Sequence, residues 1–124
     1  MAASSLGFPK RARLLTRRDF DRVFARAKRS SDEGLVLLAR PNGCDGARLG
    51  LAIARKHVRH AVERNRIKRL VRESFRHHRS QLGPLDVVVL ARRGLAEWDN
   101  ARVTAALARH WKRLHESCEA SSCC

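Results

Sequence analysis

The stretch RNRIKRLVRESFR, residues 64–76, combines cations and apolar residues in a way that suits phosphate binding. Six of its thirteen residues are Lys or Arg. A guanidinium group can hold a phosphate with two parallel hydrogen bonds and can stack on a base, so this composition suits a polyanionic ligand. The apolar residues Ile67, Leu70, Val71 and Phe75 recur at the spacing of one helix face, which predicts an amphipathic helix.

On a helical wheel this segment divides into two arcs. The arc that must pack on the rest of the protein holds Ile67, Leu70, Val71, Ser74 and Phe75. The opposite arc holds an amide and five cations: Asn65, Arg66, Lys68, Arg69, Arg72 and Arg76. Like charges at i, i+4 cost roughly a few tenths of a kcal/mol each, and a merely solvated helix usually mixes signs. We therefore favour a phosphate-binding face over a solvated face with incidental charge. Arg64 projects nearer the apolar arc, so we expect it to be partly packed or ion-paired.

The charge of the whole chain supports a polyanionic partner. The 124 residues carry 27 Lys and Arg against 12 Asp and Glu, a net charge of +15. The excess is localised, because residues 10–29 hold nine basic and two acidic residues and residues 55–79 hold ten and two. Such a field favours nucleic acid as the partner, with an anionic membrane surface second.

The sequence offers no active site or metal site of its own. Its six histidines are scattered among basic residues, and no nucleophile or pair of carboxylates accompanies them. Asp86 stands at the start of a predicted strand, where we interpret it as a turn or cap residue. The cysteines lack zinc-site spacing, and reduced thiols are the favoured interpretation of Cys44, Cys118, Cys123 and Cys124.

No targeting or membrane segment is evident, so we expect a cytoplasmic protein. No apolar run approaches the roughly 18 residues of a membrane span, and the start lacks the apolar core of a signal peptide. The Arg-rich start FPKRARLLTRR leaves an organelle transit peptide as an alternative.

The remaining pattern predicts the elements that position the basic helix. A first helix follows Thr16, and its apolar face is Phe20, Val23, Phe24 and Ala27. Strands are predicted at residues 35–40, 47–55 and from 85, with a short one near 29–31. A last helix begins at Asp99 or Asn100, with a stripe at Val103, Leu107, Trp111 and Leu114. The basic helix thus lies in a βαβ unit, and the base rate favours a right-handed crossover.

The motifs that surround the basic helix help to distinguish duplex DNA from single-stranded nucleic acid as its ligand. Neither a helix-turn-helix, nor zinc-finger spacing, nor a heptad repeat is present, which argues against duplex DNA. Phe20 and Phe24 lie beside cations, as stacking on single-stranded RNA or DNA requires. Two Phe at helical spacing are nevertheless more often plain core, and the residues alone favour that interpretation.

The basic segment and its flank, RLGLAIARKHVRHAVE, resemble the signature of the bacterial ribonuclease P protein family. The resemblance extends to FPKRARLLTRRDFDRVF, LDVVVLARRG and DNARVTAALARHWKRL, and so spans residues 8–114. It also answers the transit-peptide alternative, because the family's own domain begins in that stretch. It implies an α+β fold, a two-layer α/β sandwich of order α-β-β-β-α-β-α like domain 2 of ribosomal protein S5. The family's βαβ crossover is left-handed, against the base rate.

The resemblance also implies partners and site residues. The family protein binds the catalytic ribonuclease P RNA, here through Arg64, Asn65, Arg66, Lys68, Arg69 and Arg72. Its cleft holds the 5′ leader of precursor tRNA, here at Phe20, Phe24, Arg55, Lys56 and Leu38. Cleavage of the leader belongs to the RNA subunit and its Mg²⁺ ions, so this chain supplies neither catalytic residues nor a tightly bound metal. Neither DNA nor a membrane is expected as a partner.

Two departures from the family and one alternative function stay open. The strand lining the cleft is aliphatic and the chain has no Tyr, so Leu38 or a neighbour must replace an aromatic contact. The loop RKHVRHAV lacks a Gly that some relatives have. We expect a flexible segment 1–9, one domain at 10–116 and a disordered Ser/Cys tail at 117–124. The alternative is a structural RNA-binding protein of ribosomal type, without a role in cleavage.

Overall fold

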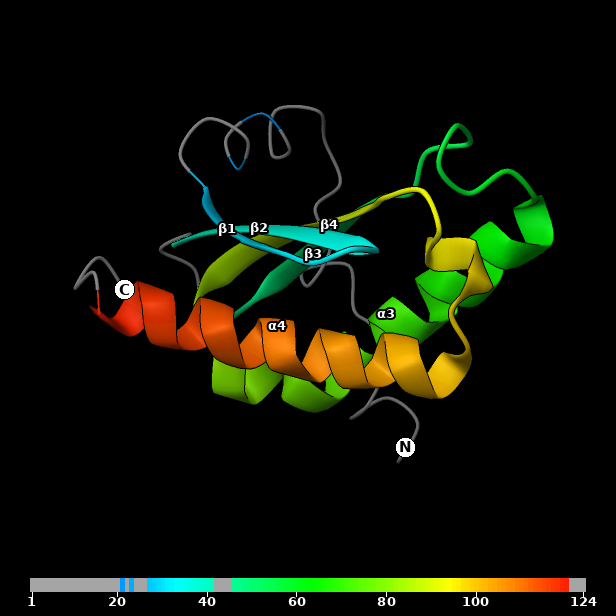
Figure 1. Ribbon diagram of the computed structural model, residues 1–124. Helices are drawn as coiled ribbons and strands as arrows, with labels where there is room; N and C mark the ends of the chain where they lie inside the picture. The colour runs from blue at the N-terminus through cyan, green and yellow to red at the C-terminus, as the bar shows by residue number, and fades with distance from the viewer. Residues whose placement is uncertain (1–20, 22, 24–26, 42–45, 121–124) are drawn as a thin grey trace.

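The computed structural model describes residues 21, 23, 27–41 and 46–120 of the chain (Figure 1). Along these residues three strands precede the basic helix, and a strand, a short 3-10 helix and a long helix follow it. The elements are β1 (Lys28–Ser31), β2 (Leu35–Pro41), β3 (Arg48–Ala52), α3 (Ala61–Leu82), β4 (Leu85–Ala91), η2 (Leu95–Glu97) and α4 (Asn100–Ala120). This order confirms the predicted succession from the first strand to the last helix, while η2 was not predicted.

The four strands form one mixed sheet in the order β1-β2-β4-β3. β1 and β2 are antiparallel, with Ser30 opposite Leu37, and β2 is antiparallel to β4. β3 is parallel to β4, with Gly50 opposite Val88. The connection through α3 is therefore the predicted βαβ crossover. It joins neighbouring strands and places α3 across the sheet.

One face of the sheet is covered by α3 and α4, which lie side by side beneath it (Figure 1). The main core fills the space between these layers. Alternate β4 residues Leu85, Val87 and Val89 face it, and the largest buried side chains among its helical members are Phe75 and Trp111. The opposite face carries a smaller cluster in which Val88 packs with Val23 and with partly buried Leu38. The sheet thus has one face covered by the two helices and an opposite face on which Val23 packs.

The helix α3 is longer than the basic segment that predicted it. It begins after His60 and ends before Gly83, whose φ of 73° lies in the left-handed region that glycine adopts without strain. Ile67, Val71, Ser74 and Phe75 are buried, as the wheel predicted. α3 is therefore fixed by its apolar arc, and the other arc is left to the surface.

The helix α4 holds α3 in place through the predicted stripe. Asp99 caps its start, because its Oδ1 accepts a hydrogen bond from the N–H of Arg102 at 2.8 Å. Trp111 meets Phe75 edge to face at 5.8 Å between ring centroids. The indole N–H donates to Ser74 Oγ at 2.8 Å, so a buried polar pair fixes the register of the two helices.

The structure corrects the interpretation of Asp86 and the length of the third strand. Asp86 is a buried member of β4 and accepts two hydrogen bonds from Arg48 at 2.7 and 2.6 Å, so it is an ion-pair residue and not a turn or cap residue. β3 ends at Ala52, three residues before the predicted end, because the chain turns at residues 55–57. α4 runs to Ala120, past the expected domain end at 116.

Candidate nucleic-acid interface

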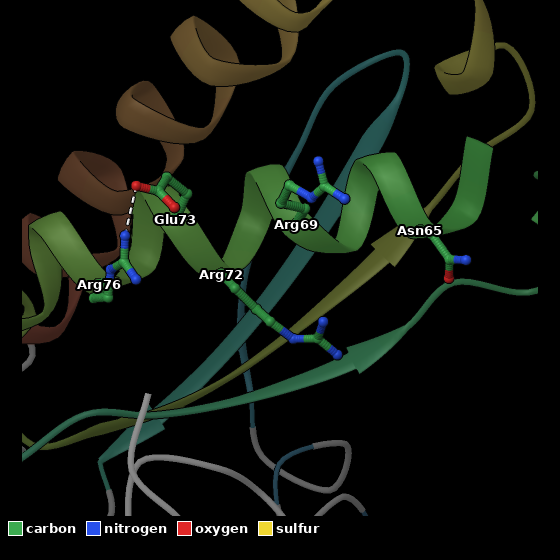
Figure 2. A pocket seen from close by; sticks show the side chains of 5 residues that line it. All are labelled: Asn65, Arg69, Arg72, Glu73 and Arg76. Atoms are coloured by element: carbon green, nitrogen blue, oxygen red, sulfur yellow. Dashed lines mark hydrogen bonds and ion pairs between the residues drawn. The ribbon is translucent and has the colours of Figure 1, made fainter. Parts of the chain in front are cut away.

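The outward face of α3 presents a row of side chains around a shallow hollow of about 440 Å³. Figure 2 shows Arg69 and Arg72 extending from the helix in different directions, with Asn65 one turn before Arg69. Asn65, Arg69 and Arg72 are exposed, and Lys68 is half-buried beside them. The hollow is lined by Asn65, Arg69, Arg72, Glu73 and Arg76. We call these five residues and Lys68 the α3 outer row.

The α3 outer row is cationic, with one acid inside it. Glu73 accepts a hydrogen bond from Arg76 at 2.6 Å (Figure 2), and His77 Nε2 lies 3.4 Å from the same carboxylate oxygen. This pairing neutralises part of the charge at the C-terminal end of the row. Lys68, Arg69 and Arg72 have no hydrogen-bonding or ion-pairing partner within the part of the chain that the structure describes. These three cations can therefore meet an anionic ligand without breaking any contact to the described residues.

Arg64 is packed by hydrogen bonds and is not ion-paired to any described residue. Its Nη1 donates to the carbonyl oxygens of Val58 at 3.1 Å and Arg59 at 2.9 Å. Both carbonyls belong to the loop between β3 and α3, and the backbone N–H of Arg64 also donates to the carbonyl oxygen of His60. Of the two predicted states of Arg64, the packed one is therefore correct.

Arg66 does not project freely from the outer arc, and here the helical wheel was wrong. Its guanidinium group donates to Glu63 Oε2, Asn100 Oδ1 and the carbonyl oxygen of Ala96. The side chain is 24% exposed. The wheel placed Arg66 outward because it considers only α3, whereas two of its three partners belong to η2 and α4.

The predicted leader-cleft residues are partly described. Leu38 lies on the sheet face that also carries Val88 and contacts the Val23 cluster, whereas Arg55 and Lys56 are exposed in the turn that follows β3. Phe20 and Phe24 lie outside the described residues, so their stacking role stays a prediction. The structure thus places Leu38 on the face opposite the two covering helices.

The histidines include one buried network that the sequence did not reveal. His110 is 1% exposed, its Nδ1 is 2.6 Å from Ser30 Oγ and its Nε2 is 2.8 Å from Asp32 Oδ2. A serine, a histidine and an aspartate are the residue types of a nucleophilic triad. Ser30 is buried, however, so a substrate cannot reach its hydroxyl group. The network fastens β1 and its following turn to α4.

Burial governs the charge state of this network. Burial lowers the pKa of His110, and nearby Arg113 and Arg109 lower it further, while the Asp32 carboxylate opposes them. Burial alone would raise the pKa of Asp32, but hydrogen bonds from Gly34, Leu35 and His110 bring it below its ordinary value. The favoured state is a neutral imidazole that donates through Nε2 to an ionised carboxylate.

Two further features of the described residues bear on the kind of site. These residues contain no group of three or more His, Cys, Asp or Glu side chains that could hold a metal ion. None of the helices found among them combines the length and the apolar character needed to cross a membrane.

Comparison with known proteins assigns this architecture to a family. A family model described as Ribonuclease P matches residues 8–115. The ribonuclease P protein component of Thioalkalivibrio sulfidiphilus is 53% identical over 112 residues, which cover 90% of this chain and 93% of the relative. The chain belongs to the ribonuclease P protein family. Its role is therefore that of a ribonuclease P subunit, part of an endoribonuclease holoenzyme.

Solved structures of the ribonuclease P family show the same α+β fold. The protein from Thermotoga maritima is 38% identical, with a TM-score of 0.74 over 81% of this chain and 97% of that one. The Staphylococcus aureus protein is 28% identical, with a TM-score of 0.75 over 86% and 92%. The predicted family and fold class are thereby confirmed.

The geometry adds two residues to the site that the ribonuclease P resemblance predicted. Glu73 and Arg76 line the same hollow as Asn65, Arg69 and Arg72. Arg76 already stood in the cationic arc of the wheel, and its i, i+4 spacing from Arg72 was the signal that could have included it. Nothing in the sequence indicated that Glu73 lines the hollow, because a single acidic residue in a basic helix has no spacing pattern that predicts a role.

Proposed function

We propose that this chain binds the catalytic RNA of ribonuclease P through the α3 outer row and binds the 5′ leader of precursor tRNA at the sheet face that carries Leu38. The protein then assists endonucleolytic removal of the leader, which gives the mature 5′ end of the tRNA. The observation that carries this proposal is the exposed set of Asn65, Arg69 and Arg72 around one hollow on a helix whose other face is buried. This activity belongs in the cytoplasm, where precursor tRNA is made.

The chemistry of the outer row suits an RNA backbone. Arg69 and Arg72 are exposed guanidinium groups that can each hold a phosphate through two hydrogen bonds, and Lys68 adds a point charge. Asn65 adds a neutral donor and acceptor for a sugar or base edge. The face thus supplies electrostatic affinity and offers little means of reading a base sequence.

The catalytic centre is assigned to the RNA subunit and its Mg²⁺ ions. Phosphodiester hydrolysis by metal ions needs oxygen ligands, chiefly carboxylates. Glu73 within the outer row and Glu63 beside it are each paired with an arginine. The protein's own contribution is therefore to bind and orient RNA.

The leader cleft is the second part of the proposal. Leu38 is a partly buried apolar side chain on this sheet face, next to the fully buried Val88, and the exposed Arg55 and Lys56 follow β3, which also belongs to the sheet. A single strand would pack a base on Leu38 while its phosphates meet these cations. The proposed aromatic contacts are Phe20 and Phe24.

A reconstitution assay tests the proposal directly. Purified protein is added to a bacterial ribonuclease P RNA at a low Mg²⁺ concentration at which the RNA alone is inactive, and cleavage of precursor tRNA is measured. We expect the protein to restore cleavage at the 5′ end of the mature tRNA. If it binds the RNA but restores no cleavage, the alternative of a structural RNA-binding protein of ribosomal type replaces this one.

A double variant tests the role of the α3 outer row. Replacing Arg69→Ala and Arg72→Ala removes two exposed cations that have no described partner, so the fold should be unaffected. The affinity for the catalytic RNA should fall, and the slope of log affinity against log salt should become shallower by about 1.4–1.8. Arg109→Ala is the matched control, because it removes an exposed cation from α4. An equal effect of the control would mean that only net charge matters.

A further inference from the structure

We infer that Arg66, the second arginine of the RNR triplet, is a positioning residue that fastens α3 to η2 and α4 and does not itself hold an RNA phosphate. This inference rests on the proposed RNA-binding role of the α3 outer row and assigns different work to neighbouring residues of one motif. Charge and sequence spacing predict the same role for Arg66 and Arg69, whereas in the structure Arg66 is held by hydrogen bonds and Arg69 is exposed.

The contacts of Arg66 occupy most of its guanidinium group. Nε and Nη2 both donate to Glu63 Oε2, at 3.1 and 2.8 Å. Nη1 donates to Asn100 Oδ1 at 2.8 Å, and Nη2 also donates to the carbonyl oxygen of Ala96 at 3.1 Å. An arginine side chain has five N–H donors, and these contacts use four of them. A phosphate could take two parallel hydrogen bonds only by displacing some of these partners.

The partners lie where the chain changes direction. Ala96 belongs to η2, and Asn100 is the first residue of α4. Both come after β4, some thirty residues beyond Arg66. The guanidinium group therefore links the N-terminal half of α3 to the corner through which the chain enters α4. It also keeps Glu63 paired, so that this acid does not oppose the cations of the outer row.

Arg69 supplies the contrast on the same helix. It lies three residues after Arg66, is exposed, lines the hollow, and has no hydrogen-bonding partner within the described ranges 27–41 and 46–120. The positions of Asn65 and Arg69 depend on how α3 sits on the sheet and on α4. Arg66 thus acts on RNA binding through the placement of these neighbours.

The salt dependence of RNA binding separates the two roles. Each phosphate contact that is lost makes the slope of log affinity against log salt shallower by about 0.7–0.9, whereas misplacement of the remaining contacts weakens affinity with little change in slope. We measure that slope and the melting temperature for the full-length protein and its variants with ribonuclease P RNA. The variants are Arg66→Ala, Arg66→Lys and Asn100→Ala, and the matched control is Arg69→Ala.

The two assignments predict opposite patterns. For a positioning residue, Arg66→Ala lowers both melting temperature and affinity and leaves the slope unchanged. Arg66→Lys does not rescue affinity, because an ammonium group cannot reach Glu63, Ala96 and Asn100 together. Asn100→Ala lowers affinity without any change of charge, and Arg69→Ala changes the slope but not the melting temperature.

The opposite results overturn the inference. A shallower slope for Arg66→Ala at an unchanged melting temperature, or full rescue by Arg66→Lys, would make Arg66 a phosphate contact. Should Arg66→Ala fail to fold, Arg66→Lys and Asn100→Ala still decide, since full affinity in both contradicts a positioning role. Failure of the wild-type protein to bind the RNA is a separate result, which rejects the proposed function itself.

Discussion

The buried imidazole of His110 joins parts of the chain that are 80 residues apart in sequence. In its neutral form Nδ1 accepts a hydrogen bond from the Ser30 hydroxyl group and the Nε2–H donates to the Asp32 carboxylate. Protonation would place a third positive charge beside those of Arg109 and Arg113. A single residue therefore makes the contact between β1 and α4 sensitive to acid.

The stability of the protein should fall as the pH falls below about 6.5, the ordinary pKa of histidine. The pKa of His110 is lowered in the folded state, so the unfolded chain takes up the proton first and is favoured by acid. The lowered pKa of Asp32 adds a second loss below about 3.8, in the same direction. Urea unfolding at pH 7.5, 6.0 and 5.0 measures this, and His110→Asn should flatten the dependence over that range. An undiminished dependence in the variant would assign the effect to other groups.

Residue-scale contacts were the least predictable part of the site. The wheel placed Ile67, Val71 and Phe75 correctly because burial of one arc is a local property of the sequence. The wheel could not place Arg66, and the sequence did not reveal the contacts of His110, because their partners Asn100 and Asp32 lie far away along the chain. Hydrogen bonds between distant segments depend on the finished fold.

At the scale of elements, the parallel pairing of β3 with β4 is reinforced by a charged contact. Arg48 and Asp86 are opposite each other in the register and share two hydrogen bonds. Their side chains are 20% and 5% exposed, so the pair is largely withdrawn from water. The sequence analysis did not single out Arg48, which balances the buried acid of the neighbouring strand.

Asp86→Asn should destabilise the fold by about 1–3 kcal/mol, because it removes the carboxylate charge that pairs with the part-buried Arg48. Chemical denaturation measures the loss. Glu73→Gln is the matched comparison, since it breaks the Glu73–Arg76 pair, whose side chains are 53% and 30% exposed. That change should cost no more than about 1 kcal/mol. Equal losses in the two variants would show that burial does not strengthen the Arg48–Asp86 contact.

The elements themselves were largely predictable, and their arrangement less so. The run from Leu35 predicted β2 and the stripe from Val103 to Leu114 predicted the buried face of α4, because both periodicities are local. The pairing of β2 with β4 was not predicted, since the register that sets Leu37 opposite Val89 depends on which strands meet. The early end of β3 and the turn η2 likewise depend on how the chain passes around the sheet.

At the scale of the whole molecule, the cations behind the net charge of +15 include some that are held by contacts within the protein and others that are exposed on its surface. Arg48, Arg64 and Arg66 are held by contacts inside the protein. The exposed Arg69 and Arg72 stand on a helix whose other arc is anchored in the core. Total charge therefore overstates the number of cations that can meet a polyanion.

The affinity of the protein for ribonuclease P RNA should fall steeply with salt. If roughly six phosphates are contacted, the slope of log affinity against log salt should be about −4 to −5. Filter binding or fluorescence anisotropy across a series of KCl concentrations measures the slope. A slope near −1 would mean that the basic surface contributes almost nothing to binding.

The place of β4 in the sheet determines when the protein can fold during its synthesis. β4 is the last strand to leave the ribosome, yet it lies between β2 and β3 and is the strand that pairs with β3. Until residues 85–91 have emerged, β3 lacks the strand with which it pairs. The apolar sides of β2 and α3 likewise lack the β4 side chains with which they form the core. Within the sheet, the β1–β2 hairpin is the one strand pair that can form earlier from local contacts. A nascent chain that stops before β4 would therefore expose Leu35, Leu49 and Phe75 to water, which makes it a substrate for chaperones or proteases.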